Sequence, residues 1–180
     1  MTRTTFYTAT TLDGYIADAN DSLDWLMTQP QDEGGPLNYE AFIADIGAIC
    51  MGSTTYEWVV RHQTEAGEPW MYEMPSYVFT HRTLPVMDGA DVTFVADDVA
   101  PVHAAMTAAA DGKDLWVVGG GDLAAQFAVA GLLDDVIVFI APVMLGAGRP
   151  LFTRPFDLEL VELDRNGAFI AARYTVTAAR

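Results

Sequence analysis

Short apolar runs alternate along this chain with segments whose apolar residues recur at helical spacing, a pattern typical of an α/β protein. The apolar runs, many of them rich in β-branched and aromatic residues, predict strands at 4–10, 48–51, 77–79, 92–95, 115–118, 136–140, 158–163 and 168–176. The amphipathic or alanine-rich segments between them predict helices at 37–45, 53–60, 98–110 and 123–130. This order predicts one α/β domain over residues 1–180, built on a central sheet.

The sheet is expected to be mixed, because the order of elements changes towards the C-terminus. Strands joined through helices pair in parallel, which applies to the middle of the chain. The last two predicted strands instead flank Asn166-Gly167, a dipeptide common in tight hairpin turns. We therefore expect a mostly parallel sheet that ends in an antiparallel C-terminal hairpin.

Composition and charge narrow the class of protein. Hydrophobic residues make up 51% of the chain and charged residues 19%, as in compact globular proteins. The formal net charge is −16 and the nine basic residues are scattered, which argues against a nucleic-acid partner. Cys50 is the only cysteine and the three histidines lack ligand spacing, so we expect neither a disulfide nor a metal site.

The chain also lacks the signals of secretion and of membrane insertion. Its N-terminus has no basic start followed by an apolar stretch. The longest apolar run, 136–145, is too short to cross a bilayer and contains Pro142. We expect a cytoplasmic protein with no membrane partner.

A run of three glycines in VVGGGDLA, residues 117–124, lies between a predicted strand and a predicted helix. Such a run either lets a phosphate approach the start of the helix or simply makes a tight turn. Gly119, Gly121 and Ala124 match the spacing of a dinucleotide fingerprint, but the next strand, 136–140, ends without the acidic residue that binds the ribose. A Rossmann fold is therefore not predicted, and the run by itself leaves both explanations open.

Two further strand ends carry groups that suit an anion. CMGSTT places Gly52 and the hydroxyl residues 53–55 at the start of a predicted helix, and FTHR places Arg82 just after the strand 77–79. Because the carboxyl ends of parallel strands meet at one edge of a sheet, we expect these groups and the glycine run to line one extended crevice.

Three motifs together resemble a known family. TLDGYIADANDSLDWL, CMGSTTYE and VVGGGDLAAQFAVAGLLDDVIVFIAPVMLGAGRPLF, in this order, resemble the dihydrofolate reductase-like superfamily. Within it, the chain is most similar to the reductase domain of riboflavin biosynthesis, the C-terminal domain of the bacterial bifunctional deaminase-reductase, and to its stand-alone relatives. The resemblance covers residues 3–176 and implies a three-layer α/β/α fold, NADPH as cofactor, reductase activity on a small molecule, and a homodimer.

The resemblance also implies roles for individual residues. The expected contacts are Thr10, Ile16 and Ala17 with the nicotinamide, Gly52, Ser53, Thr54 and Thr55 with the phosphates, Thr80, His81 and Arg82 with the adenine ribose, and Gly119, Gly120, Gly121, Asp122 and Leu123 with the pyrophosphate and the nicotinamide half. It allows a cis bond between Gly119 and Gly120. We further expect the Asp122 side chain to turn back and cap its helix, leaving the glycine N–H groups free for phosphate.

One departure from the family concerns the phosphate site. Relatives commonly have an arginine directly after the glycine of CMGSTT, which reaches the 2′-phosphate of NADPH, and here this position is Ser53. Our hypothesis is that Arg82 holds the 2′-phosphate instead.

The catalytic residues are less clearly marked. The substrate pocket is expected between the loop 18–25 and the helix near 37–42, with Trp25 as a wall. The candidate proton donors are Asp24, Glu40 and Asp13, and Asp13 is equally well explained as a turn residue. The predicted function is an NADPH-dependent reductase that transfers a hydride to a small pterin- or pyrimidine-like heterocycle or to a related imine or carbonyl compound. The alternative is a non-catalytic nucleotide-binding or assembly module with the same fold.

Overall fold

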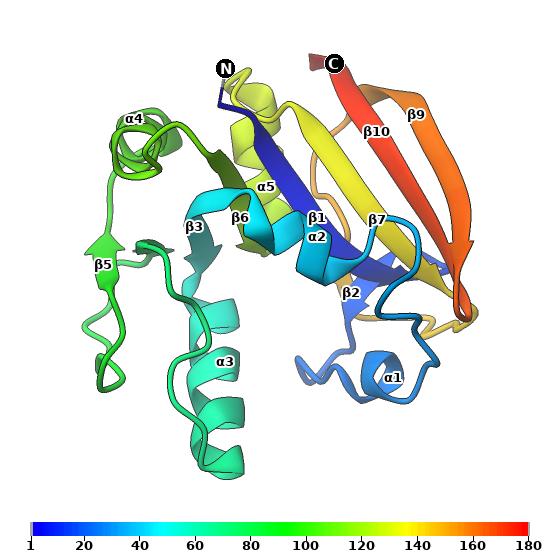
Figure 1. Cartoon of the computed structure of the whole chain (residues 1–180), viewed down its shortest axis with the longest axis horizontal. Helices are drawn as coiled ribbons and strands as arrows, with labels where there is room; N and C mark the ends of the chain where they lie inside the picture. The colour runs from blue at the N-terminus through cyan, green and yellow to red at the C-terminus, as the bar shows by residue number, and fades with distance from the viewer. Residues whose placement is uncertain (1, 180) are drawn as a thin grey trace.

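A computed structural model describes residues 2–179 of the chain, and its main feature is an eight-stranded sheet (Figure 1). The sheet has the order β5-β4-β3-β6-β1-β7-β10-β9. Its strands are β1 (Thr4–Thr11), β3 (Ile46–Gly52), β4 (Ser76–Phe79), β5 (Val92–Val95), β6 (Asp114–Gly119), β7 (Asp135–Ala141), β9 (Phe156–Asn166) and β10 (Phe169–Ala179). All neighbours from β5 to β7 are parallel, whereas β10 is antiparallel to both β7 and β9. The predicted mixed, mostly parallel sheet with an antiparallel C-terminal end is confirmed.

Helices cover both faces of this sheet, which confirms the expected three layers. The elements α2 (Tyr39–Ala44) and α3 (Ser53–Ala66) pack on one face, and α4 (Val99–Ala109) and α5 (Gly121–Val129) pack on the other. A four-residue helix, α1 (Asp24–Met27), lies in the loop after β2. Among the described residues, no helix is long and apolar enough to span a membrane.

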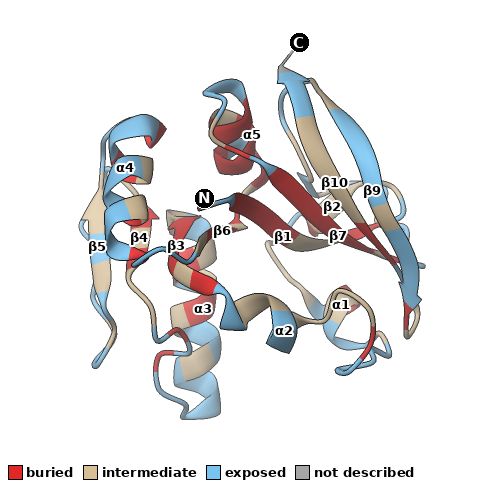
Figure 2. Cartoon of the chain, turned by 45° about the horizontal axis from the view of Figure 1, so that its top comes forward, coloured by how far each residue is buried: buried red, intermediate tan, exposed pale blue. Residues whose placement is uncertain are grey.

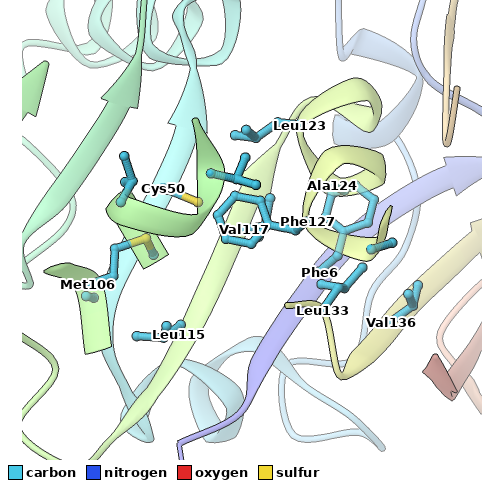
Figure 3. Close-up of a cluster of buried hydrophobic side chains, with 14 of the residues drawn as sticks. Phe6, Cys50, Met106, Leu115, Val117, Leu123, Ala124, Phe127, Leu133 and Val136 are labelled. Atoms are coloured by element: carbon cyan, nitrogen blue, oxygen red, sulfur yellow. The ribbon is translucent and has the colours of Figure 1, made fainter. Parts of the chain in front are cut away.

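The core divides into two clusters because neighbouring strand residues point to opposite faces. Phe6 and Val117 join Phe127 of α5 and Met106 of α4 in one cluster (Figure 3). Their chain neighbours Tyr7 and Trp116 lie in the other cluster, against α2 and α3. Figure 2 shows the buried residues concentrated in the central strands and on the inner sides of the helices. Each fully buried large side chain contributes about 1.5–3 kcal/mol to folding.

The connections create a crevice between β3 and β6. These strands are parallel neighbours, yet β3 leads into α3 on one face and β6 leads into α5 on the opposite face. The segments that follow β3 and β6 therefore separate at the carboxyl ends of these strands. In open α/β sheets, ligands bind at such a point.

The C-terminal hairpin turns one residue later than Asn166-Gly167 predicts. Asn166 is the last residue of β9 and pairs with Phe169, so the turn consists of Gly167 and Ala168. Asn166 is fully buried: its Oδ1 accepts a hydrogen bond from the N–H of Asp32, and its Nδ2 donates to the carbonyl oxygens of Asp32 and Pro36. The asparagine thus anchors the loop before α2 and does not form the turn.

A second, two-stranded sheet was not predicted from the sequence. It pairs β2 (Tyr15–Ala17) with β8 (Arg149–Pro150). Gly148 lies so close to the carbonyl oxygen of Ala17 that a side chain at this position would collide with it. This small sheet brings residues from both ends of the chain to the same side of the crevice.

Candidate functional site

The three strand ends predicted to meet line a single hollow of about 660 Å³. We call it the Arg82 hollow. Its residues come from the ends of β3, β4, β5 and β6 and from the helices that follow: Gly52, Ser53, Thr54, Thr55, Phe79, Thr80, His81, Arg82, Val95, Ala96, Asp97, Asp98, Gly120, Asp122, Leu123 and Gln126. The structure therefore brings CMGSTT, FTHR and the glycine run together.

A second hollow of about 460 Å³, the Trp58 hollow, adjoins the first and shares Thr54, Thr55, Gly120 and Asp122 with it. Its remaining lining residues are Thr8, Ile16, Ala17, Asp21, Leu23, Trp58, Val118, Gly119, Gly121, Arg149, Pro150 and Thr153. The two hollows form one groove, with Arg82 at one end and the Trp58 ring at the other.

Two helices begin at this groove without a side-chain cap. Gly52 is the N-cap residue of α3 and Gly120 that of α5, and neither glycine has a side chain that could bond the first N–H groups. In α5 the first N–H with a partner inside the helix is that of Ala124, which donates to the Gly120 carbonyl oxygen at 3.0 Å. Unpaired N–H groups and the partial positive charge of two helix starts make this part of the groove suitable for an anion such as a phosphate.

Each position of the glycine run favours glycine for a different structural reason. Gly120 has φ +85° and ψ 133°, a conformation that strongly favours glycine, and no atom lies within 4 Å of the place where its Cβ would be. A Cβ at Gly119 would lie 2.8 Å from the hydroxyl of Thr55, and one at Gly121 would collide with the backbone of residues 150–151. The cis bond that the resemblance allows between Gly119 and Gly120 is absent, since the described residues contain no cis peptide bond.

The expected capping role of Asp122 is also wrong. Because Gly120 is the N-cap residue, Asp122 lies inside the first turn of α5, and no side chain caps the helix. Its carboxylate accepts hydrogen bonds from the Thr153 hydroxyl and from Nε2 of Gln126, both at 2.8 Å. These bonds lower the pKa of Asp122. Asp122 therefore links α5 to the segment around Thr153 as a charged group, and the first N–H groups of α5 remain free.

Arg82 is held by an acidic partner. Its Nη1 and Nη2 donate to the two carboxylate oxygens of Glu57, at 3.1 and 2.6 Å. The hydrogen bond to Glu57 raises the pKa of Arg82. Asp97 and Asp98 line the same hollow, so its wall carries more acidic than basic side chains.

Three aspartates fasten the segment 145–153 beside the Trp58 hollow. Asp13 accepts from the N–H groups of Leu145 and Gly146 at 3.0 and 2.7 Å, Asp21 forms a two-bond ion pair with Arg149, and Asp122 accepts from Thr153. The pKa of Asp13 is lowered by the Thr11 hydroxyl and then by these backbone N–H groups, and the Arg149 hydrogen bond lowers the pKa of Asp21. All three aspartates are therefore ionised at neutral pH.

Several residues expected in the site lie elsewhere. Thr10 is buried, donates to the Tyr15 carbonyl oxygen at 3.2 Å, and lines neither hollow. Trp25 is buried in the core cluster that contains Tyr7. Asp24 lines a separate hollow of about 220 Å³ next to Trp58.

The helix α2, expected beside the substrate pocket, lines neither hollow of the groove. Its Phe42 stacks on Tyr7 with the ring centres 4.4 Å apart, and Tyr39 packs edge-on against Trp116. This packing turns the apolar side of α2 to the core. Glu40 is exposed and lines none of the three hollows, so its position does not support a role as proton donor.

Comparison with known proteins identifies the family. A family model described as the RibD C-terminal domain matches residues 4–168. The chain belongs to the RibD C-terminal domain family.

Individual relatives agree with this membership. The uncharacterised protein YwjB of Bacillus subtilis strain 168 is 32% identical over 152 residues, which cover 83% of this chain and 82% of YwjB. A crystal structure from Shewanella sp. PV-4, provisionally assigned as a riboflavin biosynthesis protein, has a TM-score of 0.81 at 24% identity and aligns over 97% of this chain and 99% of its own. RibD of Acinetobacter baumannii aligns over 98% of this chain and 58% of its own, with a TM-score of 0.68 and 16% identity. The structural similarities show a common fold.

Sequence reasoning missed some residues of the groove of this RibD-type domain. Trp58 was not among the predicted site residues, although it follows Thr54 by four residues and therefore lies on the same side of α3. Asp97 and Asp98 follow the strand 92–95 and could have been found with the same strand-end argument that located Arg82. No sequence motif marks Thr153 as a groove residue, because only the tertiary fold brings it next to the groove.

Proposed function

We propose that this RibD-type domain is an NADPH-dependent reductase that transfers a hydride to a small pterin- or pyrimidine-like heterocycle or to a related imine or carbonyl compound. The observation that carries the proposal is the pair of uncapped helix starts, α3 and α5, which open on one groove next to an arginine and a hollow with an aromatic wall. Membership of the RibD C-terminal domain family supports a reductase of the riboflavin-pathway type.

The groove fits a dinucleotide. Gly120 leaves open the space that a Cβ would fill, so a pyrophosphate can approach the start of α5. The Arg82 hollow offers Ser53 and Thr80 hydroxyls for the adenosine half, and the Trp58 hollow offers Ile16 and Ala17 beside the nicotinamide half. When bound there, NADPH supplies the hydride and leaves the protein the tasks of orientation and protonation.

The residues around the Trp58 hollow would perform those tasks. The Trp58 ring can pack against a planar substrate and exclude water, while the ion pair between Asp21 and Arg149 keeps the loop before α1 against β8. Asp21 and Asp122 are poor proton donors at neutral pH because their pKa values are lowered. We therefore expect the proton to reach the substrate from water or through the Thr8 hydroxyl.

A turnover assay tests the proposed reaction. The purified chain would be mixed with NADPH and a panel of oxidised pyrimidines, pterins, imines and quinones, and the loss of nicotinamide absorbance would be followed. Saturable oxidation with at least one compound is expected, and Trp58→Ala should slow it because the hollow loses its aromatic wall. Tight binding of NADPH without oxidation across the panel would instead favour the non-catalytic module.

We also propose that two copies of the chain pair through an uncovered apolar stripe on β9 and β10. Leu158, Leu160 and Leu163 stand opposite Val176, Tyr174 and Ala172, which contact the α5-side core, so the leucines share that face of the sheet.

The three leucines are exposed, as is Ile170 on β10. Residues 154–173 carry three arginines and four acidic residues in a chain whose formal net charge is −16. This segment of the sheet is almost neutral, so two acidic copies repel each other less here than through the rest of their surface.

A further inference from the structure

The ion pair between Glu57 and Arg82 holds the arginine that lines the groove end where a cofactor's ribose would lie. Glu57 belongs to α3, one turn beyond Ser53, and Arg82 follows β4, the strand next to β3. The N–H of Arg82 donates to the Thr80 hydroxyl at 3.0 Å, which fixes the turn after β4 and directs the arginine towards α3. Both carboxylate oxygens of Glu57 are then used by the guanidinium.

The charges around the Arg82 hollow make the binding of an anion there depend on this ion pair. Arg82 is the one arginine or lysine among the described residues that line the hollow, and Asp97, Asp98 and Asp122 line it too. A phosphate group on the ribose would therefore depend on Arg82 for a charged partner. The guanidinium of Arg82, however, is already hydrogen-bonded to the Glu57 carboxylate, and the aspartates of the hollow repel a phosphate.

We propose that Glu57 sets the preference of this protein between NADPH and NADH, by competing with the 2′-phosphate of NADPH for Arg82. The inference rests on the proposed function, because it assumes that the groove binds a dinucleotide. NADH has a hydroxyl in place of the 2′-phosphate and makes no demand on Arg82, so Glu57 opposes only the phosphorylated cofactor. The presence of Glu57 narrows the difference in affinity between the two cofactors.

The pair is suited to such an exchange because it is open to solvent. The side chains of Arg82 and Glu57 are 56% and 45% exposed, so water screens their attraction and the pair contributes little to folding. A phosphate can therefore displace the carboxylate without unfolding α3. The guanidinium needs only to turn away from α3 and towards the hollow that it already lines.

Binding measurements on Glu57→Gln test the proposal directly. The glutamine side chain has the same shape as glutamate without the charge, so Arg82 becomes available to a phosphate. We expect NADPH to bind roughly two- to fivefold more tightly than to the wild type, which corresponds to the strength of an exposed ion pair, with the affinity for NADH unchanged. Glu65→Gln removes an acidic group from the same helix away from Arg82, and it should leave both affinities as they are.

Two further measurements separate competition for Arg82 from a general loss of negative charge. In the double variant Glu57→Gln, Arg82→Ala the gain for NADPH should vanish. Adenosine 2′,5′-bisphosphate, which keeps the 2′-phosphate and lacks the nicotinamide half, should show the same gain in Glu57→Gln, whereas adenosine 5′-monophosphate should not.

The outcomes distinguish this inference from the proposed function. If both cofactors bind and their affinity ratio is the same in Glu57→Gln as in the wild type, Glu57 does not set the preference and the proposed reductase stands. A gain that persists in the double variant would likewise overturn the role of Arg82. If neither cofactor binds to the folded wild type, the proposed function fails and the inference fails with it.

Discussion

Replacing Gly120 by alanine tests whether the glycine run forms a phosphate cradle. Gly120 has φ +85° and ψ 133°, and a non-glycine residue in such a conformation costs about 1–3 kcal/mol. For a chain of this length, that cost lowers the melting temperature by about 2–12 °C. The new Cβ would also occupy the open space at the start of α5, where a pyrophosphate would lie. Losing one charge-assisted hydrogen bond there weakens NADPH binding roughly ten- to hundredfold.

A matched variant separates the effect on binding from the effect on folding. Gly112 has φ +83° with open space around its Cβ position, and it lies outside both hollows of the groove. Gly112→Ala should therefore also lower the melting temperature, and it should leave NADPH affinity unchanged. Calorimetric titration of both variants below their melting temperatures provides the comparison. If Gly120→Ala binds NADPH as tightly as Gly112→Ala, the cradle is not at Gly120 and the reasoning is refuted.

Three other predictions follow from the packing and the charges. Asn166→Ala removes three buried hydrogen bonds and should lower the free energy of urea unfolding by about 1.5–4.5 kcal/mol; a loss below about 0.5 kcal/mol would show that the loop before α2 is held by other contacts. The pKa values of Asp13, Asp21 and Asp122 are lowered in the folded protein, so their stabilisation is present above the ordinary pKa of about 3.9 and is lost as the pH falls through the folded values. Unfolding free energies between pH 7 and pH 3 should therefore fall less steeply for Asp21→Asn than for the wild type, and equal slopes would contradict this. Leu160→Glu places a charge in the apolar stripe and should give monomers by light scattering where the wild type gives dimers, whereas monomers in both would remove the proposed interface.

The layers of the fold were predictable because they depend on local patterns. Alternation puts Phe6 and Tyr7 on opposite faces of β1, and the apolar runs of β3, β6 and β7 mark strands covered on both faces. The location of the groove was predictable for a related reason. A parallel sheet brings the carboxyl ends of its strands to one edge, so Ser53, Arg82 and the glycine run had to lie near one another once the strands were recognised.

The parts that could not be predicted depend on contacts between distant residues. The dipeptide containing Asn166 favours a turn locally, but the loop at Asp32, far away in sequence, draws the asparagine into the core. Asp122 has the chemistry of a cap, yet Thr153 and Gln126 bind its carboxylate instead. The partner of Arg82 was missed in the same way, because Glu57 becomes its neighbour only through the pairing of β3 with β4.

The central claim is that the groove at the ends of β3 and β6 binds NADPH, and a direct titration tests it. Trp58 lines the hollow assigned to the nicotinamide half, so its fluorescence should change on binding, and calorimetry on the same sample gives the stoichiometry. We expect saturable binding of one NADPH per chain, with a fluorescence change that is lost in Trp58→Phe. A folded protein that shows neither heat nor a fluorescence change with NADPH or NADH would contradict the account.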